Sequence, residues 1–188
     1  MAGRIRLGRR GGRVVVVLAT AAYVSGLGLA MAPPGHAFGG SCNGRLSSVG
    51  LDASHEHGPV IIEGSKEADV IIGSRGDDII HGNEGDDTIC GGRGADDIAG
   101  GAGNDAVFGE NGDDTIRGGT DSDLISGGNG NDDLSGNADS DQLYGGKGDD
   151  ILNGVDGTDP PSDDTLKGDG GRNLCFVDAG DEVDDCHF

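Results

Sequence analysis

Large aromatic side chains are nearly absent from this sequence of 188 residues, which has no tryptophan and only 3% aromatic residues. A conventional packed core needs large apolar side chains, so the composition argues against an ordinary globular domain. Glycine is abundant instead: the chain has 40 glycines, about three times the roughly 7% that is typical of proteins.

Basic residues are also scarce, and the formal net charge is −21. Residues 1–37 contain five arginines and no acidic residue, so the rest of the chain has eight basic residues against 34 acidic ones, a net charge of −26. Because phosphate binding requires positive charge, this balance excludes a nucleic-acid partner. A disordered, solvating tail and a cation-binding protein remain as interpretations.

The N-terminus has the pattern of a secretory signal peptide. A basic segment, Arg4–Arg13, precedes the apolar stretch Val14–Ala30, and Gly35 and Ala37 place small residues at −3 and −1 of a cleavage site after Ala37. An uncleaved membrane anchor is the alternative, although about 17 apolar residues are marginal for a span of roughly 20. We therefore predict a signal peptide over 1–37 and a secreted, extracellular protein with no membrane association after cleavage.

The four cysteines, Cys42, Cys90, Cys175 and Cys186, form an even set that suits an oxidising compartment. Three connectivities are possible. Since Cys175 and Cys186 are close in sequence, we predict that they pair, which leaves Cys42 with Cys90. A zinc site is the alternative, but no CxxC or CxxH spacing occurs.

A nine-residue repeat begins at Gly64 and continues to about Gly154, with glycine at position one of every frame. Position eight is aliphatic in the first ten frames, and position six is aspartate in all ten. The position-six residues are Asp69, Asp78, Asp87, Asp96, Asp105, Asp114, Asp123, Asp132, Asp141 and Asp150. A disordered tail has no reason to place one aliphatic residue in every nine, so the repeat favours a folded array.

About five extra residues, which include Pro160 and Pro161, interrupt the frame after Gly154. The repeat then resumes at Asp164, and the following unit has Asn173 in the aspartate column and Cys175 in the aliphatic column. We interpret the interruption as a loop that bulges from the array.

One buried residue in nine predicts a very short strand at positions seven to nine and a glycine-rich turn over the first six positions. Glycine at positions one and four permits positive φ and close backbone approach. Two repeats would close one coil of a parallel solenoid, in which each unit buries its face against its neighbours. The carboxylates that stack along such turns repel one another, so the array needs a counter-ion. Carboxylate and carbonyl oxygens suit Ca²⁺ better than Mg²⁺ or zinc.

The repeat Gly100–Phe108 resembles the hemolysin-type (RTX) calcium-binding nonapeptide G-G-x-G-x-D-x-U-x at every fixed position, as do the repeats that begin at Gly127 and Gly145. The resemblance covers about residues 64–176. It implies an all-β fold, a right-handed parallel β-roll (β-solenoid) of about eleven repeats, for which we expect small disulfide-closed caps. We expect a signal peptide over 1–37, an N-terminal cap over 38–62, the β-roll over 63–176 and a C-terminal cap over 177–188.

The resemblance further implies calcium ions between turns two repeats apart, held by position-six aspartates and by carbonyls of the glycine turns. Two edges follow, each with five aspartates and four intervals, so that up to about eight ions could bind. The predicted metal-binding residues on one edge are Asp69, Asp87, Asp105, Asp123 and Asp141. Those on the other edge are Asp78, Asp96, Asp114, Asp132 and Asp150, and Asp164 continues the column after the interruption.

Position four departs from glycine in three frames of the array. Glu67 in the first repeat predicts a degraded site, whereas Asp121 and Asp139 lie on one edge in adjacent turns and would strengthen or crowd the calcium site between them. The acidic and amide residues at position five, such as Asp77 and Asp113, are expected to be solvated rather than ligating.

No catalytic domain fits in the roughly 25 residues between the predicted cleavage site and the first repeat. The segment His55-Glu56-His57 lacks the HExxH spacing of a zinc enzyme, so we interpret it as a solvated loop. The sequence therefore predicts a non-enzymatic calcium-binding module that serves a structural or interaction role with an unidentified protein or cell-surface partner. The alternatives are an accessory module for a separate exported partner and an enzyme with an unrecognised site.

Overall fold

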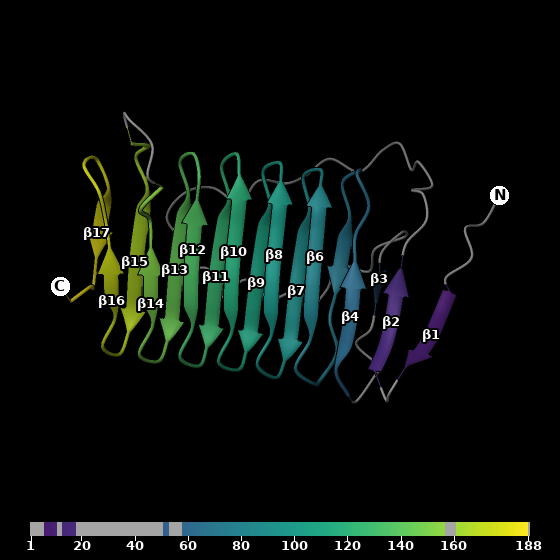
Figure 1. Cartoon of the computed structure of the whole chain (residues 1–188). Helices are drawn as coiled ribbons and strands as arrows, with labels where there is room; N and C mark the ends of the chain where they lie inside the picture. The colour runs from purple at the N-terminus through teal and green to yellow at the C-terminus, as the bar shows by residue number, and fades with distance from the viewer. Residues whose placement is uncertain (1–5, 11–12, 18–50, 53–57, 157–160, 188) are drawn as a thin grey trace.

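The computed structural model describes residues 6–10, 13–17, 51–52, 58–156 and 161–187, and in these ranges the chain is all-β, with no helix. Parallel strands stack as a β-solenoid of about seven turns, from β4 and β5 at one end to β16 and β17 at the other (Figure 1). Even-numbered strands from β4 onward form one sheet, and odd-numbered strands from β3 onward form the other. The fold class predicted from the repeat is therefore confirmed.

The strands of the even-numbered sheet are β2 (Arg13–Val17), β4 (Val60–Glu63), β6 (Ile79–Glu84), β8 (Asp97–Ala102), β10 (Thr115–Thr120), β12 (Asp133–Asn137), β14 (Ile151–Asn153) and β16 (Leu174–Phe176), with β1 (Arg6–Arg10) antiparallel at its end. The strands of the odd-numbered sheet are β3 (Leu51–Asp52), β5 (Val70–Ile72), β7 (Thr88–Arg93), β9 (Ala106–Asn111), β11 (Leu124–Asn129), β13 (Gln142–Lys147), β15 (Thr165–Gly170) and β17 (Glu182–Asp184).

Within the uninterrupted array, neighbouring strands of one sheet pair residues that are 18 apart, as two nine-residue units per coil require; across the insert the separation is 23, as between Leu143 and Leu166. Ile116 of β10, for example, pairs with Ile98 of β8 and with Leu134 of β12. The predicted strand length is wrong, however. Of the ten strands from β6 to β15, eight are six residues long and run from position seven through position three of the next unit, so that only positions four to six form the turn. Backbone pairing continues through the glycines, as between Gly101 and Gly119.

The core is a double column of position-eight side chains between the two sheets. These residues are fully buried, and the column ends at Cys175. They are Ile71, Ile80, Ile89, Ile98, Val107, Ile116, Ile125, Leu134, Leu143, Leu152 and Leu166. Each stacks on the residue of the coil before and after it, so every coil buries its apolar side chain only against its neighbours.

The solenoid has more strands than the predicted repeats account for, because both predicted caps contribute strands. β4 lies in the predicted N-terminal cap and pairs with β6, and β17 lies in the predicted C-terminal cap and pairs with β15. At the N-terminal side, β2 pairs with β4 although it lies within the predicted signal peptide. No helix in the described residues is long and apolar enough to cross a membrane.

A disulfide joins Cys175 to Cys186, as predicted, and ties the last core position to the tail. Cys90 is also disulfide-bonded. Its predicted partner, Cys42, lies outside the described residues, as does the segment His55-Glu56-His57.

Candidate metal centre

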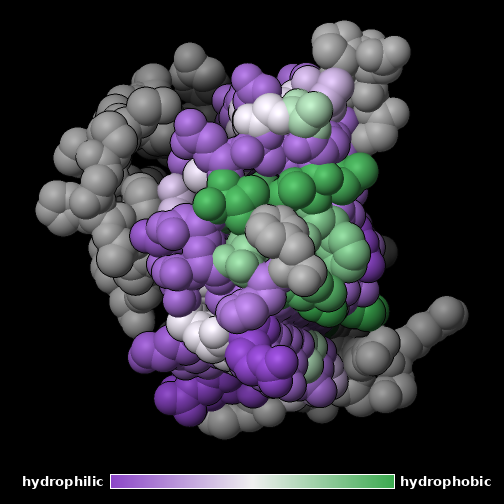
Figure 2. All heavy atoms as spheres, turned by 90° about the vertical axis from the view of Figure 1, so that its left-hand side faces the viewer, coloured by the Kyte–Doolittle hydropathy of each residue, from purple (hydrophilic) through white to green (hydrophobic). Residues whose placement is uncertain are grey.

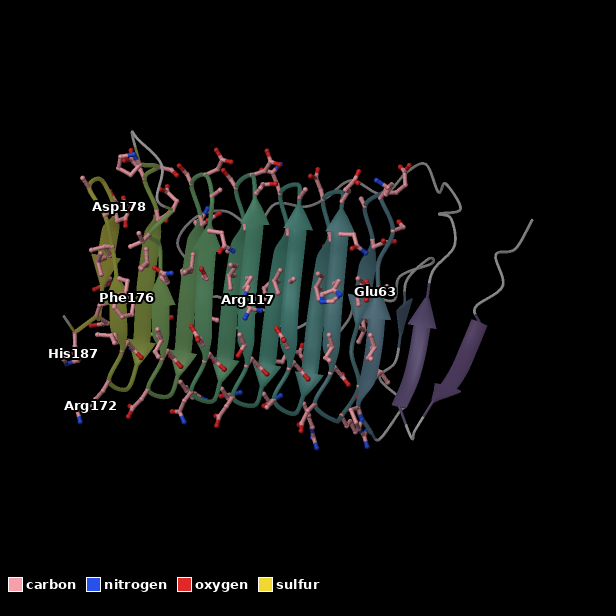
Figure 3. The ribbon with its side chains drawn as sticks, viewed as in Figure 1. Glu63, Arg117, Arg172, Phe176, Asp178 and His187 are labelled. Carbon is pink, nitrogen blue, oxygen red and sulfur yellow. A yellow bond between two sulfur atoms is a disulfide. The ribbon has the colours of Figure 1, made fainter. Side chains whose placement is uncertain are left out.

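The position-six aspartates form two columns, one along each edge where the chain turns from one sheet to the other. We call the turns from an even-numbered to an odd-numbered strand the upper edge, and the opposite turns the lower edge, as they appear in Figure 3. The upper edge contains Asp69, Asp87, Asp105, Asp123, Asp141 and Asp164. The lower edge contains Asp78, Asp96, Asp114, Asp132 and Asp150, followed by Asn173.

A ladder of hydrogen bonds links successive aspartates of each edge. The backbone N–H of Asp96 donates to Oδ1 of Asp114 over 2.9 Å, and that of Asp114 donates to Oδ1 of Asp132 over 2.9 Å. The same bond recurs along both edges at 2.7–3.0 Å. It crosses the interruption from Asp141 to Asp164 over 2.8 Å, which confirms that Asp164 continues the column.

The second carboxylate oxygen of most of these aspartates is buried and has no hydrogen-bond partner. The aspartates with such an Oδ2 are Asp87, Asp96, Asp105, Asp114, Asp123, Asp132, Asp141, Asp150 and Asp164. Each of these residues is no more than 3% exposed. An unpaired buried carboxylate oxygen is costly, so nine of them in register favour the binding of a cation.

Glycine at position one leaves space for the Oδ2 atom of the aspartate, because it has no side chain. A Cβ added to Gly118 would collide with Oδ2 of Asp123 and with the carbonyl oxygen of Gly136 in the next coil. Position one does not adopt positive φ, so our prediction of positive φ there is wrong, whereas the prediction of close approach is confirmed. Positive φ occurs at position four, as predicted, for example at Gly103, and also at position two, for example at Gly101.

The first aspartate of each edge differs from those that follow. Oδ2 of Asp69 accepts hydrogen bonds from the backbone N–H and the hydroxyl of Ser65, over 2.6 and 2.9 Å. At Asp78, the N–H of Ser74 donates to Oδ2 over 2.6 Å and its hydroxyl to Oδ1 over 2.8 Å. Serine at position two thus satisfies these carboxylates from within the chain. The nine-residue spacing does not predict this role, although Ser65 and Ser74 are the only serines at position two of the array.

Burial raises the pKa of the position-six aspartates from Asp78 to Asp164, and neighbouring carboxylates raise it further, against the lowering effect of backbone hydrogen bonds. The pKa is raised to about 8 for Asp96 and Asp123, to about 7 for Asp87, Asp132 and Asp141, and to about 6 for Asp105, Asp114 and Asp164. The fold therefore holds these carboxylates where negative charge is unfavourable unless a cation is bound.

The donor set is made of hard oxygen atoms: buried carboxylates from the turns and the carbonyls that stack beside the glycines. Such oxygens fit Ca²⁺ and do not fit zinc, which favours imidazole and thiolate. Within the described ranges, no group of three or more His, Cys, Asp or Glu side chains converges to hold a metal ion. A site along an edge would accordingly depend on one or two carboxylates together with backbone carbonyls.

Two further predictions concern the outer part of the turns. The N–H of Asp121 donates to Oδ2 of Asp139 over 3.2 Å, which places the Asp139 carboxylate between these two turns. The position-five side chains are exposed, as expected, but they also accept hydrogen bonds from the next coil. Oδ1 of Asp113, for example, accepts a bond from the N–H of Asn131 over 2.8 Å.

The model of one protein family, the RTX calcium-binding nonapeptide repeat, matches the chain in four copies, over residues 63–98, 91–125, 126–159 and 161–181. The matched residues make up more than half of the sequence. No curated protein matches the chain.

Proposed function

The chain belongs to the RTX calcium-binding nonapeptide repeat family, whose repeats bind calcium in a β-roll, and on this premise we propose that it is an extracellular, non-enzymatic module that folds when calcium binds. In this proposal the folded roll serves a structural or interaction role. The ligands are the position-six aspartates and the carbonyls of the glycine turns.

The observation that carries the proposal is the row of nine buried Oδ2 atoms without a hydrogen-bond partner. The chain positions each of these oxygens beside a position-one glycine, and in several coils beside the carbonyl of the next coil. Bound calcium would neutralise the negative charge of these carboxylates. Because carboxylates only a few ångströms apart repel in a poorly solvated turn, the ordered roll is unfavourable at neutral pH without that charge.

The expected stoichiometry is up to about eight ions, and the free Oδ2 atoms support binding sites along both edges. The upper edge has five aspartates with a free Oδ2, and the lower edge has four. The serine-bonded Asp69 and Asp78 contribute less, because protein donors already occupy their oxygens.

Secretion is supported by two features. The basic and apolar segments of residues 1–37 have the composition of an export signal. The disulfide between Cys175 and Cys186 is the kind of bond that persists in oxidising compartments.

Calcium titration followed by circular dichroism tests the proposal. In chelator at pH 7.5 we expect a disordered spectrum, and towards millimolar Ca²⁺ we expect a cooperative gain of β signal. Sodium chloride at equal ionic strength is the control, since it screens exposed charges but cannot occupy a buried site. A β-rich spectrum in excess chelator, or one restored by sodium chloride alone, would contradict the proposal.

An accessory role for a separate exported partner is a second candidate, and one surface feature favours it. Ile151, Val155, Leu174 and Phe176 are each 40–48% exposed at the C-terminal part of the roll. Three of them line a cavity of about 480 Å³ together with Asp133 and Asn153. Figure 2 shows hydrophobic residues gathered on this end face, with hydrophilic residues above and below them. Co-purification of a partner that is lost when Phe176 is changed to serine would support this role.

A further inference from the structure

The aspartate column of the lower edge ends at an asparagine, Asn173, which is 1% exposed. Both polar atoms of its side-chain amide have partners. Oδ1 accepts a hydrogen bond from the N–H of Asp150 over 3.0 Å, as the Oδ1 atoms of the aspartates do in earlier coils, and Nδ2 donates to the carbonyl oxygen of Asp185 over 3.3 Å. Asn173 therefore continues the ladder, but it leaves no buried side-chain oxygen without a partner.

The surroundings of Nδ2 correspond to those of the free Oδ2 atoms. Beside Gly145, one coil earlier on the same edge, lie Oδ2 of Asp150 and the carbonyl oxygen of Gly168, both within 2.8 Å of the point that a Cβ would occupy. Beside Gly168, a Cβ would collide with Nδ2 of Asn173 and with the carbonyl oxygen of Asp185. The amide nitrogen thus replaces the carboxylate oxygen, and a carbonyl of the tail replaces the glycine carbonyl.

This replacement changes the chemistry of the turn. In the earlier turn, two oxygen acceptors lie beside the same glycine and Oδ2 of Asp150 has no donor, an arrangement that a bound cation would stabilise. In the last turn, an N–H donor faces a carbonyl acceptor, so the pair is satisfied without a metal ion. The amide is also neutral, so it adds no charge to the repulsion along the edge.

Backbone hydrogen bonds hold the tail around Asn173. The N–H of His187 donates to the carbonyl oxygen of Asn173 over 2.6 Å, and the N–H of Cys175 donates to the carbonyl oxygen of His187 over 3.4 Å. Leu174 and His187 form a parallel bridge. Figure 3 shows Arg172 at the lower edge and His187 at the same end of the molecule. Donors and acceptors of the chain itself therefore close the last turn of the lower edge.

The other ends of the two columns allow a comparison. The first turn of each edge is closed by a serine, Ser65 or Ser74, which donates to the carboxylate of its own turn. At the last aspartate of the upper edge, Asp164, no protein donor reaches Oδ2, and this oxygen has no partner. A free oxygen is thus found at the one end where the chain supplies no donor to that place.

We propose that the amide of Asn173 substitutes for a calcium ion at the last turn of the lower edge. This turn takes no ion, and it holds the tail by its own hydrogen bonds. Asn173 thereby decides where calcium binding stops on this edge. The inference rests on the calcium binding proposed above, and it implies that Asn173→Asp restores the two neighbouring acceptors found beside Gly145 and converts the turn into a calcium site.

Isothermal titration of the purified, disulfide-intact protein with calcium chloride, together with hydrogen exchange of residues 177–187, tests this role. Asn173→Asp is expected to bind one calcium ion more than the wild type and to keep the tail amides protected at saturating calcium. Asn173→Ala removes the amide without supplying a ligand, so it should gain no ion, and its tail amides should exchange faster even at saturating calcium. The matched control is Gln142→Glu, which makes the same change from amide to carboxylate at an exposed position of β13 and should alter neither property.

The outcomes separate this role from the calcium binding of the repeats. If the wild type binds no calcium, the proposed function and the role of Asn173 both fail. If the wild type binds calcium and Asn173→Asp gains no ion, only the role of Asn173 is overturned. Tail amides that stay unprotected at saturating calcium in Asn173→Asp, as in Asn173→Ala, would show a purely structural amide and overturn it too. An extra ion in Gln142→Glu would have the same effect, because added negative charge alone would then explain the gain.

Discussion

At the scale of single residues, position two decides what the position-six aspartate of the same turn does. Where position two adopts positive φ, as at Asn83 and Gly92, Oδ2 of Asp87 and Asp96 is left without a partner. Ser65 and Ser74 do not adopt positive φ, and their N–H groups point at the carboxylate. Glycine and asparagine adopt positive φ more readily than serine does, and they occupy position two in all but one of the later turns of the array, where Glu110 adopts it. The residue type at position two therefore favours one turn over the other.

Ser74→Gly is therefore expected to create a stronger calcium site at Asp78. Glycine permits the positive φ found in the later turns, which would turn the N–H away from Oδ2 of Asp78. Isothermal titration should show one additional ion, or tighter binding of one ion. Ser74→Ala removes the same hydroxyl without permitting that backbone, and an equal gain in this variant would contradict the explanation.

The raised pKa values of the buried aspartates predict how the metal-free protein depends on pH. Their folded pKa lies above the usual value of 3.8, at about 6 to 8, so the folded state binds more protons than the unfolded state between these limits. The stability they contribute is present below about pH 4 and is lost as the pH rises through 6 to 8.

In calcium-free buffer, the β signal should accordingly be higher at pH 5 than at pH 8. Calcium should remove this difference, because cation binding and protonation compete for the same oxygens. A β signal that increases from pH 5 to pH 8 in the absence of calcium would show that these carboxylates are not held as the structure indicates.

At the scale of elements, the six-residue strand and the three-residue turn depend on close approach at position one. The carbonyl of Gly136 and Oδ2 of Asp123 both occupy the space beside Gly118. The turn is thus closed tightly enough to bring carboxylate and carbonyl oxygens together, while pairing continues on both sides of it. The turn geometry, rather than the strand, builds the cation site.

Gly118→Ala should destabilise the folded protein by about 1–3 kcal/mol, the usual effect of overpacking. It should also raise the calcium concentration at the midpoint of folding, because the added methyl group displaces ligand oxygens. Both effects can be measured by circular dichroism during calcium titration and urea unfolding. The matched control is Gly58→Ala, whose added Cβ meets no atom within 4 Å and should leave both midpoints unchanged.

At the scale of the whole molecule, the solenoid is a stack in which each coil depends on the next for both its core and its carboxylate ladder. The ladder ends differently on the two edges. Asp164 donates its N–H to Asp181 on the upper edge, whereas Asp150 donates to Oδ1 of Asn173 on the lower edge. The neutral amide of Asn173 closes the lower edge without adding charge, while the upper edge continues into the tail.

The sequence by itself determined the repeat, its two columns and the assignment of alternate aspartates to opposite edges. These properties are periodic and local, so a spacing of nine or 18 residues is enough to infer them. The continuation of the column at Asp164 and the pairing of Cys175 with Cys186 were also predictable, since both follow from the frame and from short sequence separation.

Only the tertiary structure decided which aspartates keep a free oxygen and which residues outside the repeat join them. Ser65 and Ser74 satisfy their aspartates through a local turn whose φ the repeat pattern does not specify. Asp178 meets Asp156 and Asp181 because the insert and the tail converge at one edge, and no period relates these residues. Contacts of this kind depend on how the chain closes its last coil, so the sequence spacing alone does not predict them.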